Sequence, residues 1–102
     1  MKDAPRYSVK PSIVLRKAKE IHNQKGHGPA FGQNRDGSMC VGYALVRAAN
    51  ELATYNPCGT WQEARNYVEV DDMSLWNDEI GQPGHTGGEC DEMFDRAIKL
   101  AE

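Results

Sequence analysis

The closing segment, GECDEMFDRAIKLAE at residues 88–102, has an apolar residue at every third or fourth position. This spacing places the apolar side chains on one face of an α-helix and the charged side chains on the other. The apolar face comprises Cys90, Met93, Phe94, Ala97, Ile98 and Ala101. A helix of this kind is stable only where other elements cover its apolar face, so the rest of the chain has to supply apolar partners.

Two earlier segments show the same helical spacing between start and stop signals. The run IVLRKAKEIH follows Ser12, which is suited to cap it, and either Ile13 or Val14 belongs to its apolar face before Gly26 ends it. Ser38 is placed to cap the second run, MCVGYALVRAANELA, which Pro57 cannot continue. Small residues in the second run allow close approach by another helix, so we expect this helix to be central.

Two pairs of residues have the spacing of a capping box, in which a hydroxyl and a carboxylate satisfy backbone amides at a helix start. Thr60 and Glu63 predict a third helix that starts at the next residue. Its apolar face comprises Trp61, Ala64, Tyr67 and Val68. Thr86 and Glu89 predict the start of the closing helix.

No segment alternates apolar and polar residues as a half-buried strand does. We therefore expect an all-α fold, a compact single-domain bundle of about four helices with two glycine-rich loops. The loops are residues 26–37 and 71–86, with a short helical turn around 74–78, and residues 1–11 form an extended N-terminal arm. A chain of 102 residues supports one modest core and no second domain.

The composition excludes several classes of protein. No run approaches the roughly 20 apolar residues of a membrane span, and no apolar stretch follows the charged start to form a signal peptide. Three cysteines are too few for the disulfide framework of a secreted domain. We therefore expect a cytoplasmic protein with reduced thiols and no membrane partner.

The two halves of the chain carry opposite charge. Through Glu51 there are nine Lys and Arg against four Asp and Glu, a net of +5, and from Leu52 there are three against eleven, a net of −8. An acidic chain overall disfavours nucleic acid as a partner. The asymmetry instead predicts neutralisation within the fold or between the subunits of a homo-oligomer.

Histidine and cysteine spacing gives little support to metal or catalytic chemistry. No two short-spaced pairs of ligands occur, so we expect no metal and no cofactor. Cys40 lies near a predicted helix start, where the helix dipole favours a thiolate, and a histidine could act as its base. Its neighbours Met39, Val41 and Ala44 favour an inert, buried thiol instead.

Three motifs occur in a recognisable order: LRKAKEIHNQKGHGPAFGQNRDGSMCVGYALVRAA, then WND, then HTGGECDEMFDRAIKLA. This order resembles a family of small proteins of unknown function, containing Trp-Asn-Asp, from actinobacteria and their phages. The chain departs from the pattern at Tyr43, where glycine is usual, and at His27, where tryptophan is common. The resemblance implies no activity, but it implies a phage origin and a site of action in the host cytoplasm.

Three functions fit these patterns, and we expect a small non-catalytic helical binding protein that acts on a host protein. The first alternative is sequestration of a small anionic ligand such as a signalling nucleotide, held at the helix start after His85 with Trp76 stacking on it. We nevertheless expect Trp76 to anchor its loop to the core rather than to stack on a ligand, because large indoles are often buried. The second alternative is a minor enzyme that uses Cys40 or His85. The predicted contact residues are Trp76, Asn77, Asp78, His85, Thr86, His27, Arg35 and Arg47.

Overall fold

The structure is a computed structural model, and it describes residues 8–26, 39–69 and 87–102. Within these ranges the chain forms four helices and no strand: α1 (Pro11–Lys25), α2 (Val41–Leu52), α3 (Pro57–Arg65) and α5 (Gly87–Ala101). The predicted all-α class is therefore confirmed. None of the described helices is long and apolar enough to cross a membrane. The predicted turn at 74–78 lies outside the described residues.

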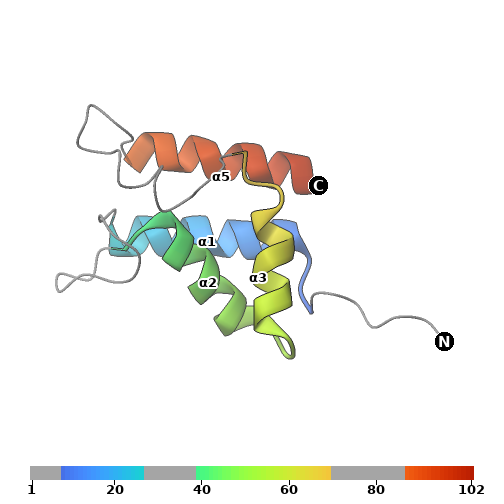
Figure 1. Cartoon of the computed structure of the whole chain (residues 1–102). Coiled ribbons are helices and arrows are strands. Elements are labelled where there is room, and N and C mark those ends of the chain that lie inside the picture. The colour runs from blue at the N-terminus through green and yellow to red at the C-terminus, as the bar shows by residue number, and fades with distance from the viewer. Residues whose placement is uncertain (1–7, 27–38, 70–86) are drawn as a thin grey trace.

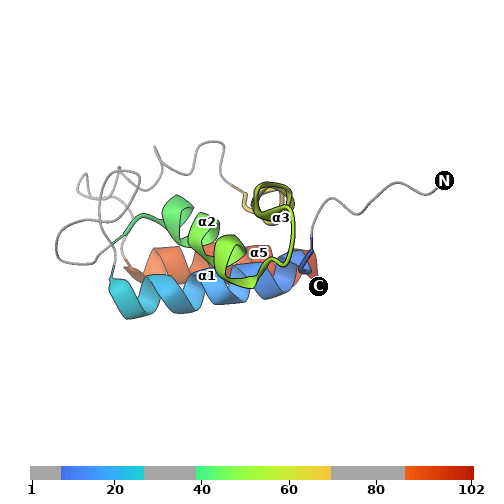
Figure 2. The same cartoon turned by 90° about the horizontal axis from the view of Figure 1, so that it is seen from below.

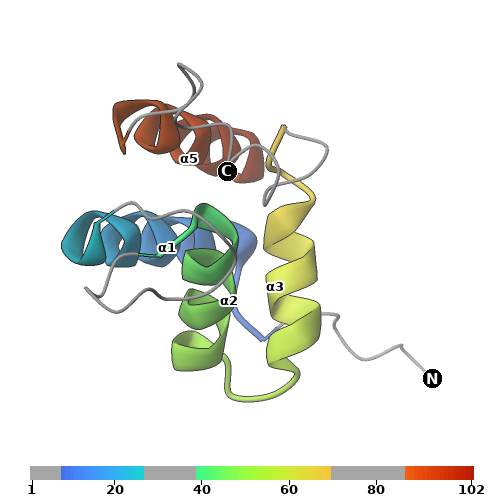
Figure 3. The ribbon, with the colours of Figure 1, turned by 60° about the vertical axis from the view of Figure 1, so that its left-hand side comes forward.

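The helices pack in two pairs. α1 and α5 lie side by side and run in opposite directions (Figure 1). α2 and α3 form a helical hairpin that packs on one side of α1, as the view from below shows (Figure 2; also Figure 3). α1 packs against each of the other three helices, whereas α2 packs mainly against α1 and α3. The prediction that α2 is the central helix is therefore wrong, and α1 has that position.

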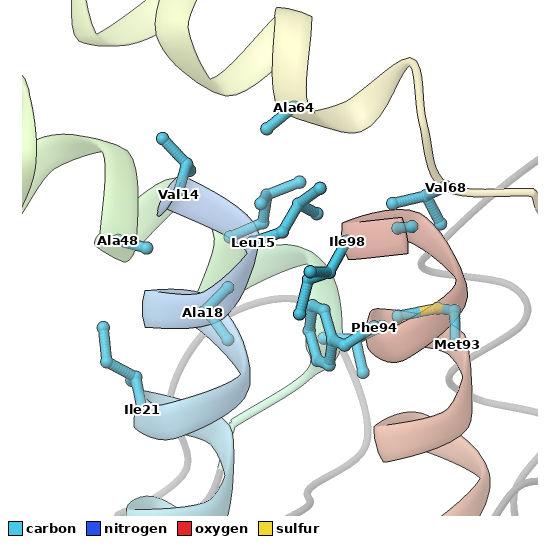
Figure 4. Close-up of a cluster of buried hydrophobic side chains, with 14 of the residues drawn as sticks. Val14, Leu15, Ala18, Ile21, Ala48, Ala64, Val68, Met93, Phe94 and Ile98 are labelled. Carbon is cyan, nitrogen blue, oxygen red and sulfur yellow. The ribbon is translucent and has the colours of Figure 1, made fainter. Parts of the chain in front are cut away.

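A single core lies where α1, α2, α5 and the end of α3 converge (Figure 4). The predicted apolar face of α5 is buried there except at Ala101, which is half-buried. On α1 the core takes Val14, while Ile13 stays 46% exposed. Leu15 and Leu45 are also completely buried, although the helical spacing alone had not singled them out. The largest core side chains are Phe94, Leu15, Met39 and Leu45.

The start of α1 differs from the prediction. Pro11 is the first helical residue, Lys10 is the N-cap in an extended conformation, and no side chain caps the helix. Proline suits this first position because its fixed φ is helical and its missing N–H would have no partner there. Ser12 is therefore inside the helix, and the prediction that it caps α1 is wrong. Gly26 ends α1 as predicted. Its φ is 90°, and its backbone N–H donates a hydrogen bond to the His22 carbonyl.

The start of α2 also differs. Its N-cap is Cys40, whose sulfur accepts a hydrogen bond of 3.2 Å from the Tyr43 backbone N–H. The prediction that Ser38 caps this helix is therefore wrong. One backbone bond ties this start to the end of α1, because the Met39 N–H donates to the Gly26 carbonyl at 2.9 Å.

α3 starts four residues earlier than the capping-box spacing predicts, at Pro57 rather than at Trp61. Asn56 is the N-cap, and its side-chain oxygen accepts a 3.0 Å bond from the Gly59 N–H. The φ of Asn56 is 45°, in the left-handed region that asparagine tolerates better than most residues. The Thr60–Glu63 capping box is therefore wrong. The second predicted capping box, Thr86 with Glu89, lies outside the described structure, because it depends on residue 86 and on the side chain of Glu89.

Thr60 has a different role, as a buried bridge between α3 and the segment before α1. Its hydroxyl donates to the Asn56 carbonyl at 3.0 Å and accepts from the Ser8 backbone N–H at 3.0 Å. The Ser8 hydroxyl lies 3.3 Å from the same oxygen. Thr60 is completely buried, so these polar groups find their partners away from water.

Opposite charges on α1 and α5 meet along the line where the two helices pack. Lys19 Nζ lies 2.7 Å from Asp95 Oδ1, and Arg16 forms an ion pair with Glu102. The basic first half and the acidic second half of the sequence therefore neutralise each other in part within one chain. This arrangement accounts for some of the charge asymmetry without requiring an oligomer.

We expect the Lys19–Asp95 pair to add little to stability, because the Asp95 side chain is 59% exposed. A double-mutant cycle with Lys19→Ala and Asp95→Ala should give a coupling energy of about 0.2–1 kcal/mol. Urea denaturation at low salt and in 1 M NaCl measures it, and the coupling should shrink in salt because the pair is screened by ions. A coupling that is large and independent of salt would contradict this view of the pair.

Candidate functional site

Most of the predicted contact residues cannot be placed by the structure. Arg47 is the exception, and it lies on α2 with its Nε 3.5 Å from Glu51 Oε1, one helical turn away. The residues that lie outside the described ranges are Trp76, Asn77, Asp78, His85, Thr86, His27 and Arg35. Their roles stay predictions, and Arg47 on its own defines no site.

Within the described residues, the best candidate site is a groove between α2 and α3. It has a volume of about 290 Å³, and most of its wall is apolar. Val46 and Asn50, one turn apart on α2, form one side, while the first two turns of α3 form the other. The residues that line it are Val46, Asn50, Pro57, Cys58 and Trp61. We call it the α2–α3 groove.

A larger depression of about 600 Å³ lies beside the α2–α3 groove. Its described lining comes from α3 and the residues that cap it, and it is mainly polar. A single helix presents a convex surface, so this depression encloses a ligand less well than a groove between two helices does. We therefore regard the smaller α2–α3 groove as the stronger candidate.

Trp61 is the largest side chain of the groove, and it is only half-buried. Its Nε1 is buried, and no hydrogen-bond acceptor reaches it in the described part of the chain. Burial of an N–H without an acceptor costs about 1–3 kcal/mol, a cost that phenylalanine at this position would avoid. The described residues therefore give the indole N–H no stabilising hydrogen bond.

One other described side-chain atom is buried without a hydrogen-bond partner, and its position in the fold explains this. Asp91 Oδ1 is also buried without a donor. Asp91 lies near the start of α5, where the positive end of the helix dipole stabilises a carboxylate. Among the residues that the structure describes, no comparable local interaction explains the Trp61 N–H.

The three cysteines differ in exposure, and none forms a disulfide. Cys40 and Cys90 are completely buried, and the sulfur of Cys40 caps α2. Cys58 is exposed at the rim of the α2–α3 groove, where it accepts a long 3.7 Å contact from Gln62 Nε2. The geometry thus gives Cys40 a structural role, as the buried cap of α2.

This difference in exposure predicts the reactivity of the thiols. In the folded protein, a chromogenic disulfide reagent should modify one thiol quickly, and Cys58→Ser should abolish this fast phase. All three thiols should react once the protein is unfolded in urea, because burial is what protects Cys40 and Cys90. A fast phase that persists in Cys58→Ser would show that one of the buried thiols is accessible.

The described residues bring no three His, Cys, Asp or Glu side chains together as a metal ion would require. His22 is buried in the core, with its ring centroid 6.1 Å from that of Phe94 at an angle of 57°. It is therefore a packing residue of the α1–α5 contact. His27 and His85 lie outside the described ranges.

The sequence did not predict the α2–α3 groove. Val46 was not singled out in its helix, and Trp61 was assigned to an apolar face. Pro57 was interpreted as a helix stop, although it is the first residue of α3. The Asn-Pro pair before the tryptophan was the available signal for the start of α3, since proline is favoured at the first position of a helix.

Comparison with known proteins adds no family to this description. No protein-family model, no curated protein and no solved structure matches the chain. The resemblance to small Trp-Asn-Asp proteins of actinobacteria and their phages therefore stays a prediction from the sequence motifs.

Proposed function

We propose that this chain is a small, non-catalytic helical binding protein whose α2–α3 groove receives an uncharged, apolar segment of a protein partner. The observation that carries the proposal is Trp61, a large and only half-buried side chain that borders an apolar groove. Tryptophan is enriched among the few residues that dominate protein interfaces. In line with the resemblance, we propose that the chain is a phage protein and that its partner is a protein of the host cell.

The size and chemistry of the groove favour a protein partner over a nucleotide. A volume of about 290 Å³ is at the lower limit of small-molecule pockets, which span about 300–1,000 Å³. No lysine or arginine is among the described residues that line it, so these residues offer no cation to a phosphate group. The anionic-ligand alternative rests on Trp76 and His85, which lie outside the described residues, and it stays a prediction from sequence.

The proposal is tested by a charge placed in the groove. Val46→Glu should weaken partner binding at least about tenfold, or about 1.4 kcal/mol, because the carboxylate would be desolvated on binding. The matched control is Ile13→Glu, the same kind of substitution at a position that is 46% exposed on α1. Affinity capture from lysate of the organism that carries the gene, compared between the two variants, identifies the partner. Calorimetry with the purified partner then measures both affinities.

A second variant separates binding from folding. Trp61→Phe keeps an aromatic ring in the groove but removes the unpartnered N–H, so we expect a change in stability of less than about 1.5 kcal/mol. Partner affinity should fall because phenylalanine offers the partner less apolar surface than tryptophan does, whereas the thermal midpoint should stay close to that of the wild type. The proposal is wrong if both groove variants bind as the wild type does, or if Ile13→Glu loses the same partner.

A further inference from the structure

We draw no further inference here: the strongest candidate, the exposed thiol of Cys58 on the first turn of α3, belongs to the groove already described, and nothing in the structure shows what binds or covers it.

Discussion

Phe94→Ala should lower the free energy of unfolding by about 3–5 kcal/mol, the range for large-to-small changes of a buried aromatic ring. Phe94 is completely buried on α5, and its ring packs against His22 of α1. The substitution removes apolar contacts and leaves a cavity in the one core that all four described helices share. Among the described helices α5 packs mainly against α1, and Phe94 lies in that contact.

The expected loss is large beside the total stability of a small domain, which is about 5–15 kcal/mol. For a chain of this size each kcal/mol shifts the thermal midpoint by about 4–8 °C, so circular dichroism melting and urea denaturation both measure it. Should the alanine variant be unfolded at 25 °C, Phe94→Leu leaves a smaller cavity and gives a measurable midpoint. Leu100→Ala on the same helix is the control, because Leu100 is 54% exposed and its loss should change stability by less than about 0.5 kcal/mol. Equal losses at both positions would contradict the packing described for α5.

The apolar faces of the helices could be predicted from sequence because helical periodicity is a property of each segment alone. The face of α5 was predicted correctly. On α1 the prediction left open whether Ile13 or Val14 is buried, and the buried residue is Val14. The direction from which α2 and α5 approach α1 decides which of these two residues is turned toward the core. That direction is set by tertiary packing, so periodicity could not decide it.

Helix starts were predicted poorly, and at α1 and α3 the errors have one physical reason. Ser12, Ser38 and Thr60 all have side chains suited to an N-cap, but the cap is the residue at which the chain turns into the helix. Pro11 and Pro57 each occupy the first position of a helix, which moves both starts toward the N-terminus. Proline was read as a residue that stops helices, whereas its fixed φ also favours their first turn.

The α2–α3 groove was not predictable because its two walls belong to different helices. Each lining residue looks ordinary in its own segment, and the groove exists only because α2 and α3 fold back on each other (Figure 3). The charge asymmetry was more informative. It predicted that the halves could neutralise each other, and the Lys19–Asp95 and Arg16–Glu102 pairs show that this happens within one chain.

The second large effect is expected at Thr60. Thr60→Val keeps the shape of the side chain but removes the oxygen that accepts from the Ser8 N–H and donates to the Asn56 carbonyl. We expect a loss of about 1–3 kcal/mol, because a buried backbone N–H is left without its acceptor. Thr60→Ser is the matched control, since it keeps the hydroxyl and loses one methyl group, worth about 0.8 kcal/mol.

Hydrogen exchange distinguishes this bridge from a loss of packing alone. The Ser8 amide should be protected in the wild type and in Thr60→Ser, and it should exchange freely in Thr60→Val, because the Thr60 hydroxyl is its acceptor in the described part of the chain. Amides in the middle of α5 should keep their protection in both variants, after correction for the change in global stability. A Ser8 amide that exchanges freely in the wild type would contradict the bridge, and Thr60 would then contribute to α3 alone.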